Sequence, residues 1–117
     1  MKIPSIITTT LASATTTSGA HTYDVHGMNI GSLQLNATLT SSDTAAITLK
    51  ISNDGINFVG FSTAKTVTFT GGGTVNALFE LGVIDYAYLQ VNWGAPSAST
   101  LTLVGVLYGT PTVIYNA

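Results

Sequence analysis

Apolar and polar residues alternate along most of this chain with a period of two. Over residues 33–40, Leu or Ala stands at every odd position and Gln, Asn or Thr at every even one. Over residues 45–51, Ala, Ile or Leu again fills the odd positions. Because successive side chains of a β-strand point to opposite faces of a sheet, this pattern predicts strands with one buried and one solvated face. A shift of one residue would exchange the faces, so the pattern also predicts a fixed register.

Turn-forming residues divide the rest of the chain into further short strands. Ser52-Asn53-Asp54-Gly55 predicts a hairpin, since Asp-Gly favours the positive φ values of tight turns, and Gly71-Gly72-Gly73 predicts a hairpin tip. Strands are expected at residues 33–40, 45–52, 56–61, 65–70, 75–81, 86–93, 99–108 and 111–115. No segment has the apolar spacing of an amphipathic helix. The predicted fold class is all-β: a single antiparallel β-sandwich, jelly-roll-like, with an extended N-terminal arm.

Residues 1–19 differ from the remainder because they are rich in Thr and Ser and offer little to bury. We expect them to form an N-terminal arm, with the sandwich domain at residues 20–117. The arm could lie on a neighbouring protein surface, or it could form a strand in its own sheet. The apolar residues that would serve either purpose are Ile3, Ile6, Ile7 and Leu11.

Two predicted strands are apolar on both faces, which is unusual for a half-solvated antiparallel sheet. In residues 100–108, Leu101, Leu103 and Leu107 share one face, while the other face carries Val104, Val106 and Tyr108. In residues 86–93, Tyr86 and Tyr88 stand opposite Leu89, Val91 and Trp93. Contiguous exposed apolar patches mark contact surfaces, although the arm or the second sheet could cover these. The candidate interface residues are Ile3, Ile6, Ile7, Leu11, Tyr86, Tyr88, Val104, Val106 and Tyr108.

Composition narrows the range of partners. Only 7% of the residues are charged, three are lysine and none is arginine. Lys2, Lys50 and Lys65 are scattered, so the chain lacks the basic patch that nucleic-acid binding requires. No apolar run approaches the roughly 20 residues of a membrane span. We therefore expect neither nucleic acid nor membrane as a partner.

Candidate catalytic and metal-binding groups are few. His21 and His26 have no further ligands at metal-binding spacing, and cysteine is absent. The five acidic residues are isolated, and Asp54 is best explained as a turn former. Neither a Gly-x-Ser-x-Gly elbow nor a phosphate-binding loop is present. We expect no enzyme activity, no catalytic residues, no cofactor and no metal, with calcium between loops as the open alternative.

Tyr86 and Tyr88 also raise the possibility of a sugar-binding face. They could stack on sugar rings while Gln90 and Asn92 bind hydroxyl groups. Aromatic residues are equally typical of protein interfaces, which is the interpretation we favour.

A resemblance to a known family lies in residues 51–58, ISNDGINF, residues 85–93, DYAYLQVNW, and residues 98–109, ASTLTLVGVLYG. These segments resemble the small β-sandwich virion proteins of tailed bacteriophages, over about residues 33–109. The hairpin is also similar to that of discoidin-like jelly rolls, from which this short chain departs by having no cysteine.

The phage resemblance implies an accessory role in the virion. The expected function is a capsid decoration or cement protein, which would bind the major capsid protein or other virion proteins and form homo-oligomers. The expected location is the virion, at the capsid surface or the head–tail region, after assembly in the host cytoplasm. The alternative function is a carbohydrate-binding module with a glycan partner.

Overall fold

The computed structural model describes residues 5–61 and 63–111, and every regular element in them is a β-strand. The strands are β1 (Ser5–Thr15), β2 (Gly19–Asp24), β3 (Met28–Leu39), β4 (Thr44–Ser52), β5 (Val59–Gly60), β6 (Thr66–Thr70), β7 (Gly73–Val83), β8 (Tyr88–Trp93) and β9 (Leu101–Pro111). The all-β prediction is therefore confirmed.

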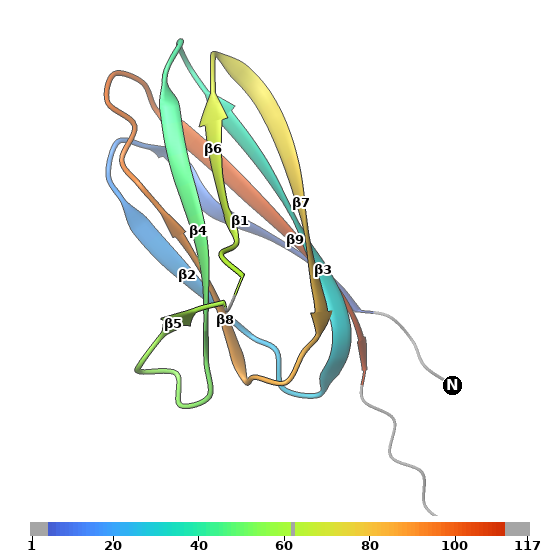
Figure 1. Cartoon of the computed structure of the whole chain (residues 1–117). Coiled ribbons are helices and arrows are strands. Elements are labelled where there is room, and N and C mark those ends of the chain that lie inside the picture. The colour runs from blue at the N-terminus through green and yellow to red at the C-terminus, as the bar shows by residue number, and fades with distance from the viewer. Residues whose placement is uncertain (1–4, 62, 112–117) are drawn as a thin grey trace, which may run out of the picture.

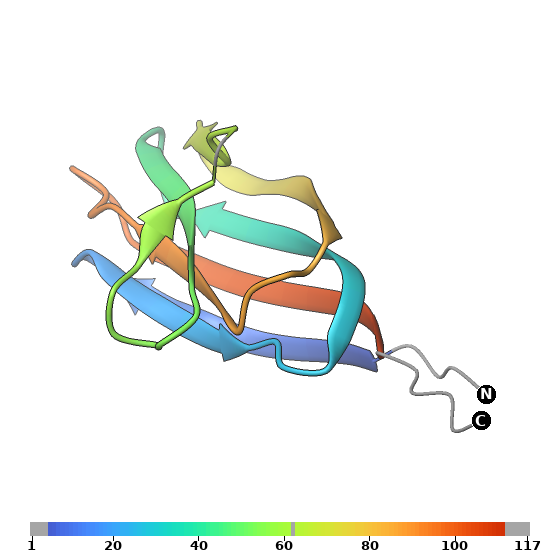
Figure 2. The same cartoon turned by 60° about the horizontal axis from the view of Figure 1, so that its bottom comes forward.

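The strands form two antiparallel sheets packed face to face (Figures 1 and 2). Sheet A has the order β1-β9-β3-β7. Sheet B has the order β2-β8-β4-β5, and β6 pairs with β4 beside β5. The predicted antiparallel β-sandwich is thus present.

The hydrophobic core fills the space between the sheets. Sheet A contributes the odd-numbered leucines of β3 and β9, and sheet B contributes alternating residues of β4 and β8. The largest side chains that are almost fully buried are Phe69, Leu33, Leu35, Ile47, Leu49, Leu89, Leu101, Leu103, Leu107, Val25 and Val91. The period-two pattern therefore predicted the buried faces of β3, β4, β8 and β9 correctly.

The described part of the N-terminal segment is a strand of sheet A. β1 pairs with β9 from Ser5, opposite Gly109, to Thr15, opposite Leu101. This is the second of the two arrangements weighed for residues 1–19, and Ile3 lies outside the described residues. The pairing has a physical reason, because it satisfies the outer backbone edge of β9 and adds Ala12 to the core. The boundary predicted after residue 19 stays a prediction.

Two predicted connections differ from the structure. Residues 56–61 contain only the short β5, because the carboxylate of Asp54 accepts hydrogen bonds from the backbone N–H groups of Ile56 and Asn57. Those amides are therefore held in the loop. Gly71-Gly72-Gly73 is not a hairpin tip within one sheet, since it carries the chain from β6 in sheet B to β7 in sheet A. The φ values of Gly71 and Gly73, +103° and +96°, fit this sharp corner.

Gly105, in the middle of β9, fixes how closely the two sheets approach. The side chain of Tyr23 crosses from β2, and its hydroxyl group lies where a β-carbon on residue 105 would be. That hydroxyl is buried and has no hydrogen-bond partner among the described residues. Burial raises the pKa of Tyr23 above its usual value. A residue without a side chain is therefore required opposite Tyr23.

We expect Gly105→Ala to reduce the free energy of unfolding by about 1–3 kcal/mol, the usual cost of overpacking a core. Tyr23→Phe removes the clashing hydroxyl, so the cost of Gly105→Ala should fall in that background. Denaturant unfolding of the two single variants and the double variant measures both effects. Gly60→Ala is the matched control, because among the described residues, apart from the two chain neighbours, no heavy atom lies within 4 Å of its added β-carbon. An equal cost with and without the hydroxyl would contradict the proposed contact.

Candidate binding surface

The outer face of sheet A carries apolar side chains on β1, β9 and β7. The pairing of β1, β9, β3 and β7 aligns three rows of outward-facing residues across the sheet. The rows are Ile6-Tyr108-Ser32-Glu80, Thr8-Val106-Gln34-Leu78 and Thr10-Val104-Asn36-Asn76. We call the apolar members of these rows, Ile6, Leu78, Val104, Val106 and Tyr108, the sheet A patch.

The sheet A patch is accessible in this chain. Ile6, Leu78 and Tyr108 expose 67%, 62% and 40% of their surface, while Val104 and Val106 are half-buried between neighbouring strands. Beside Tyr108 lies a shallow cavity of about 270 Å³, lined by Ile30, Gly31, Ser32, Glu80, Gly82 and Tyr108. Solvated faces of antiparallel sheets are normally polar, so these accessible apolar side chains need an explanation.

The structure brings together four of the residues predicted for an interface: Ile6, Val104, Val106 and Tyr108. Ile7 and Leu11 do not join them. Ile7 pairs with the buried Leu107 and therefore lies on the core side of sheet A, and Leu11 packs against the core. Leu78 was missed by the sequence analysis, although an apolar residue between Asn76 and Glu80 breaks the alternation and could have been noticed.

The predicted shared face of Tyr86 and Tyr88 does not form. Tyr86 exposes only 9% of its surface and packs edge-on against Phe61, with ring centroids 5.8 Å apart. Burial, with a contribution from Asp85, raises the pKa of Tyr86 to about 12. β8 begins only at Tyr88, and residues 86–87 form a bend in which the backbone N–H of Ala87 donates to the carbonyl of Ser52. The strand alternation therefore does not extend back to Tyr86.

The outer face of sheet B is polar. Tyr88, half-buried, shares this face with Gln90 and Asn92 of the same strand. The ring of Tyr88 lies edge-on to His26 at 5.1 Å, and His26 Nδ1 is 2.6 Å from an oxygen of Asp24. A hydrogen bond from the backbone N–H of His26, together with this side-chain contact, lowers the pKa of Asp24.

The loop beside Tyr88 is organised by the carboxylate of Asp54. It accepts hydrogen bonds from the N–H groups of Ile56 and Asn57, the amide of Asn57 and the hydroxyl of Ser52, at 2.8–3.0 Å. This is the turn-forming role that the sequence predicts for Asp54. At the opposite end of the sandwich, Asp43 accepts hydrogen bonds from residues 97–99 and so ties two loops together. The backbone donors, with the hydroxyl and amide donors, hold the pKa of both carboxylates well below the usual range.

Within residues 5–61 and 63–111, no three His, Asp or Glu side chains gather where they could hold a metal ion. Nor does the described structure contain a helix long and apolar enough to cross a membrane.

Comparison with known proteins finds similarity only at the level of the fold. Neither a family model nor a curated protein sequence matches the chain. Among solved structures, the SPBc2 prophage-derived protein YomS is similar with a TM-score of 0.57 and 10% identity, covering 91% of this chain and 95% of YomS. The Tobacco streak virus coat protein dimer is similar with a TM-score of 0.54 and 13% identity, covering 97% of this chain and 90% of the coat protein chain. The carbohydrate-binding module TmCBM61, solved with β-1,4-galactotriose, is similar with a TM-score of 0.51 and 9% identity, covering 81% of this chain and 62% of TmCBM61.

Acid should destabilise the protein through Asp54 and Asp43. A carboxylate whose pKa is lowered by folding stabilises the fold above its unfolded pKa of about 3.9, and that stability is lost as the pH falls below this value. Asp54→Asn keeps an oxygen acceptor but removes the charge, so its stability should fall less than that of the native chain on acidification. Asp43→Asn/Asp54→Asn should be less sensitive still.

Thermal unfolding between neutral pH and pH 2 measures this dependence. Asp85→Asn is the control, since Asp85 accepts no hydrogen bond among the described residues, and it should retain the native acid sensitivity. If the double variant were as acid-sensitive as the native chain, groups other than Asp43 and Asp54 would control the loss of stability in acid.

Proposed function

We propose that this chain is a non-enzymatic structural protein of a virus particle, and specifically a decoration or cement protein of a tailed bacteriophage capsid. Its partner is the major capsid protein or another virion protein, and its place is the capsid surface or the head–tail region. The sheet A patch is the observation that carries this proposal, because it presents apolar side chains of β1, β9 and β7 on the outer face of one sheet.

Burial of the patch provides the driving force for binding. Each Å² of apolar surface removed from water contributes about 25 cal/mol, from which the costs of association must be subtracted. Glu80 is the one charged residue in the three rows that contain the patch. Few charges therefore have to lose their water, which agrees with the depletion of charge in interface cores. Many identical copies bound in this way would stabilise a shell.

The comparisons support the proposal through the fold. A β-sandwich of this kind occurs in a prophage-derived protein and in a virus coat protein. The fold is therefore compatible with a virion component.

The first test is the number of copies in purified particles, measured by quantitative mass spectrometry against the major capsid protein. A ratio near that of the shell subunits is expected for a decoration protein. Particles carrying Val106→Lys should contain at least about tenfold fewer copies, because a buried, unpaired lysine is costly to desolvate. Gln90→Lys is the matched control on the polar outer face of sheet B and should bind normally.

Both variants should show the native thermal midpoint, which separates loss of binding from loss of folding. A few copies per particle would place the protein at the portal, tail or fibre, and its absence would overturn the virion role. Normal incorporation of Val106→Lys would overturn the role of the sheet A patch.

Carbohydrate binding is the second candidate, and the outer face of sheet B favours it. Tyr88 shares this face with amide and hydroxyl groups. The side-chain Nε2 of Gln90 lies 3.4 Å from the hydroxyl oxygen of Thr22. The similarity to TmCBM61 adds support through the fold.

For this candidate, binding to β-1,4-linked galactose oligomers or host-surface glycans should be detectable by calorimetry. Tyr88→Ala should abolish the binding, while Tyr108→Ala on sheet A should preserve it. A complete lack of glycan binding would exclude the candidate for the sugars tested.

A further inference from the structure

β7 is a long strand at the end of sheet A. It spans 11 residues, and among residues 5–61 and 63–111 it pairs only with β3, so its other edge is unpaired by the described part of the chain. From Gly73 to Glu80 the pairing continues through eight consecutive residues of β7 without a shift of register. The free edge therefore presents a regular row of backbone N–H and C=O groups, which is a template for another strand.

The other sheet edges have features that discourage such pairing. β1 contains two register shifts, and Ala14 has a positive φ of 47°. β2 has six residues and ends at the charged Asp24. β5 and β6 have two and five residues. Bulges, charges and short length are the devices that protect natural edges, whereas Gly73–Phe79 of β7 contains no charged residue and no proline.

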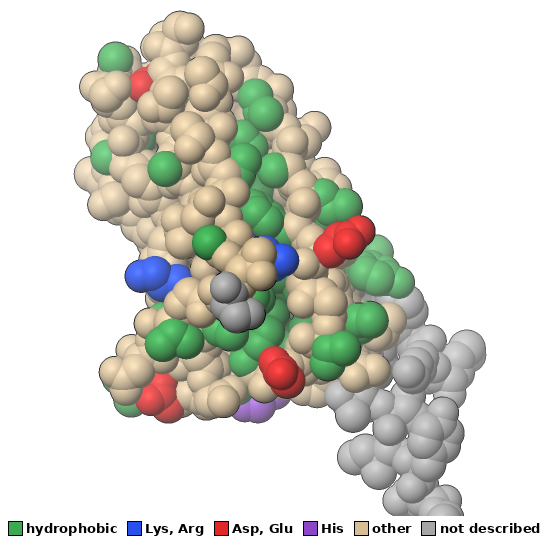
Figure 3. Space-filling model, viewed as in Figure 1, with side chains coloured by type: hydrophobic (Ala, Val, Ile, Leu, Met, Phe, Trp, Pro, Cys, Tyr) green, Lys and Arg blue, Asp and Glu red, His purple; other side chains and the backbone are tan. Residues whose placement is uncertain are grey.

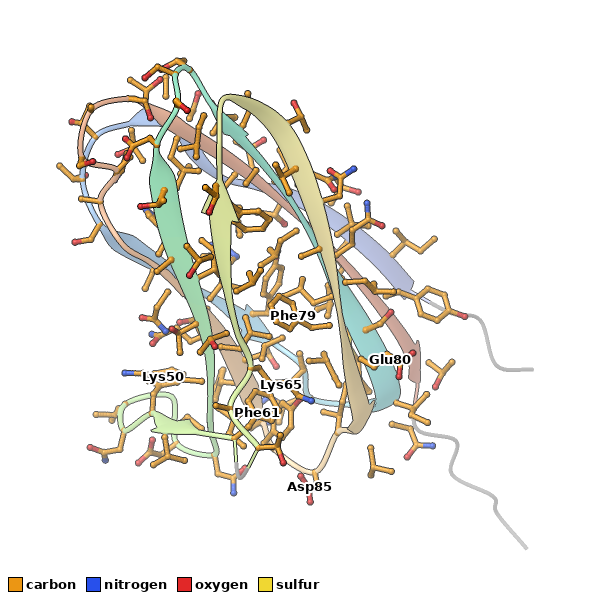
Figure 4. The ribbon with its side chains drawn as sticks, turned by 45° about the horizontal axis from the view of Figure 1, so that its top comes forward. Lys50, Phe61, Lys65, Phe79, Glu80 and Asp85 are labelled. Atoms are coloured by element: carbon orange, nitrogen blue, oxygen red, sulfur yellow. The ribbon has the colours of Figure 1, made fainter. Side chains whose placement is uncertain are left out.

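The sandwich is also open on the β7 side. Phe61, Val67 and Phe79 pack against the core but are only partly buried. Figure 3 shows hydrophobic side chains in a strip along the opening between β6 and β7, and Figure 4 shows Phe79 within it. Val75, on the core side of β7, remains 37% exposed. A strand added beside β7 would cover part of this apolar surface.

We propose that β7 pairs antiparallel with β7 of a second copy of this chain, about a two-fold axis perpendicular to sheet A. This axis places the outer faces of the two copies of sheet A on the same side of the dimer. It also requires one residue of β7 to stand opposite the same residue of the second copy. With Ala77 on the axis, Phe79 stands opposite Val75 of the second copy. Leu78 then stands opposite Asn76, and Glu80 opposite Thr74.

This register is chemically self-complementary. On the core side, apolar residues meet across the axis, with the small Ala77 at the centre. On the outer side, Glu80 meets a threonine hydroxyl, and the carboxylates of the two copies lie at opposite ends of the pairing. Within the paired β7 strands no like charges are brought together, and the strand backbones satisfy each other's free hydrogen-bonding groups.

The pairing would join the four strands of each sheet A into one continuous sheet of eight. The two sheet A patches would then lie on the same side of the dimer. This inference does not require the proposed function, because the free edge and the open side exist whatever the patch binds.

Sedimentation velocity over a range of concentrations tests the pairing. The native chain should dimerise. Asn76→Lys should raise the dissociation constant at least about tenfold, because it places lysines diagonally across the axis, and Asn76→Asp should act in the same way. An equimolar mixture of the two variants should dimerise again, which also shows that both are folded. Thr22→Lys on β2 is the matched control and should dimerise like the native chain.

Cross-linking locates the axis. The chain has no cysteine, so a single introduced cysteine can form a disulfide only with a second copy. Ala77→Cys should give a covalent dimer on mild oxidation, whereas Thr22→Cys should not. A native chain that stays monomeric would overturn the proposal. If neither Asn76 variant weakens the dimer, or if Ala77→Cys does not give a covalent dimer, the interface lies elsewhere. Either result would also overturn the proposal.

Discussion

The register of β9 between β1 and β3 is the constraint on which the rest of the structure depends. A slip of one residue would expose the buried leucines of β9 and force Val104, Val106 and Tyr108 into the core. It would also remove Gly105 from its place opposite Tyr23, where a side chain cannot be accommodated. Because β9 holds the centre of sheet A, its register decides both how the sheets pack and what the outer surface displays.

The sequence predicted the fold class and most strand faces because both depend on local alternation. Leu33, Leu35, Ile47 and Leu49 are buried as the pattern requires. It could not decide where residues 5–15 lie, since their partner β9 is about 90 residues away along the chain and the contact leaves no local signal. Tyr86 was misplaced because the chain bends at residues 86–87, before β8 begins, and the local alternation does not reveal this bend.

The candidate surface was predicted in part. Val104, Val106 and Tyr108 were identified because a strand with two apolar faces is visible in one sequence segment. The contributions of Ile6 and Leu78 depend on the strand order β1-β9-β3-β7, which sequence alternation does not specify. The two outer faces of the sandwich consequently differ in character. Sheet A carries apolar side chains on three of its four strands, whereas the outer face of sheet B is polar and is bordered by the loop around Asp54.

The antiparallel pairing of β1 with β9 has a mechanical consequence. Ser5, near the start of the chain, stands opposite Gly109, near its end, so both strands enter the ladder from the same corner. A force that pulled these two ends apart would load the hydrogen bonds one pair after another, as in a zipper, rather than all together in shear. Tension between the ends would therefore peel β1 from the sheet at low load, while traction distributed across the outer face would be shared by four strands.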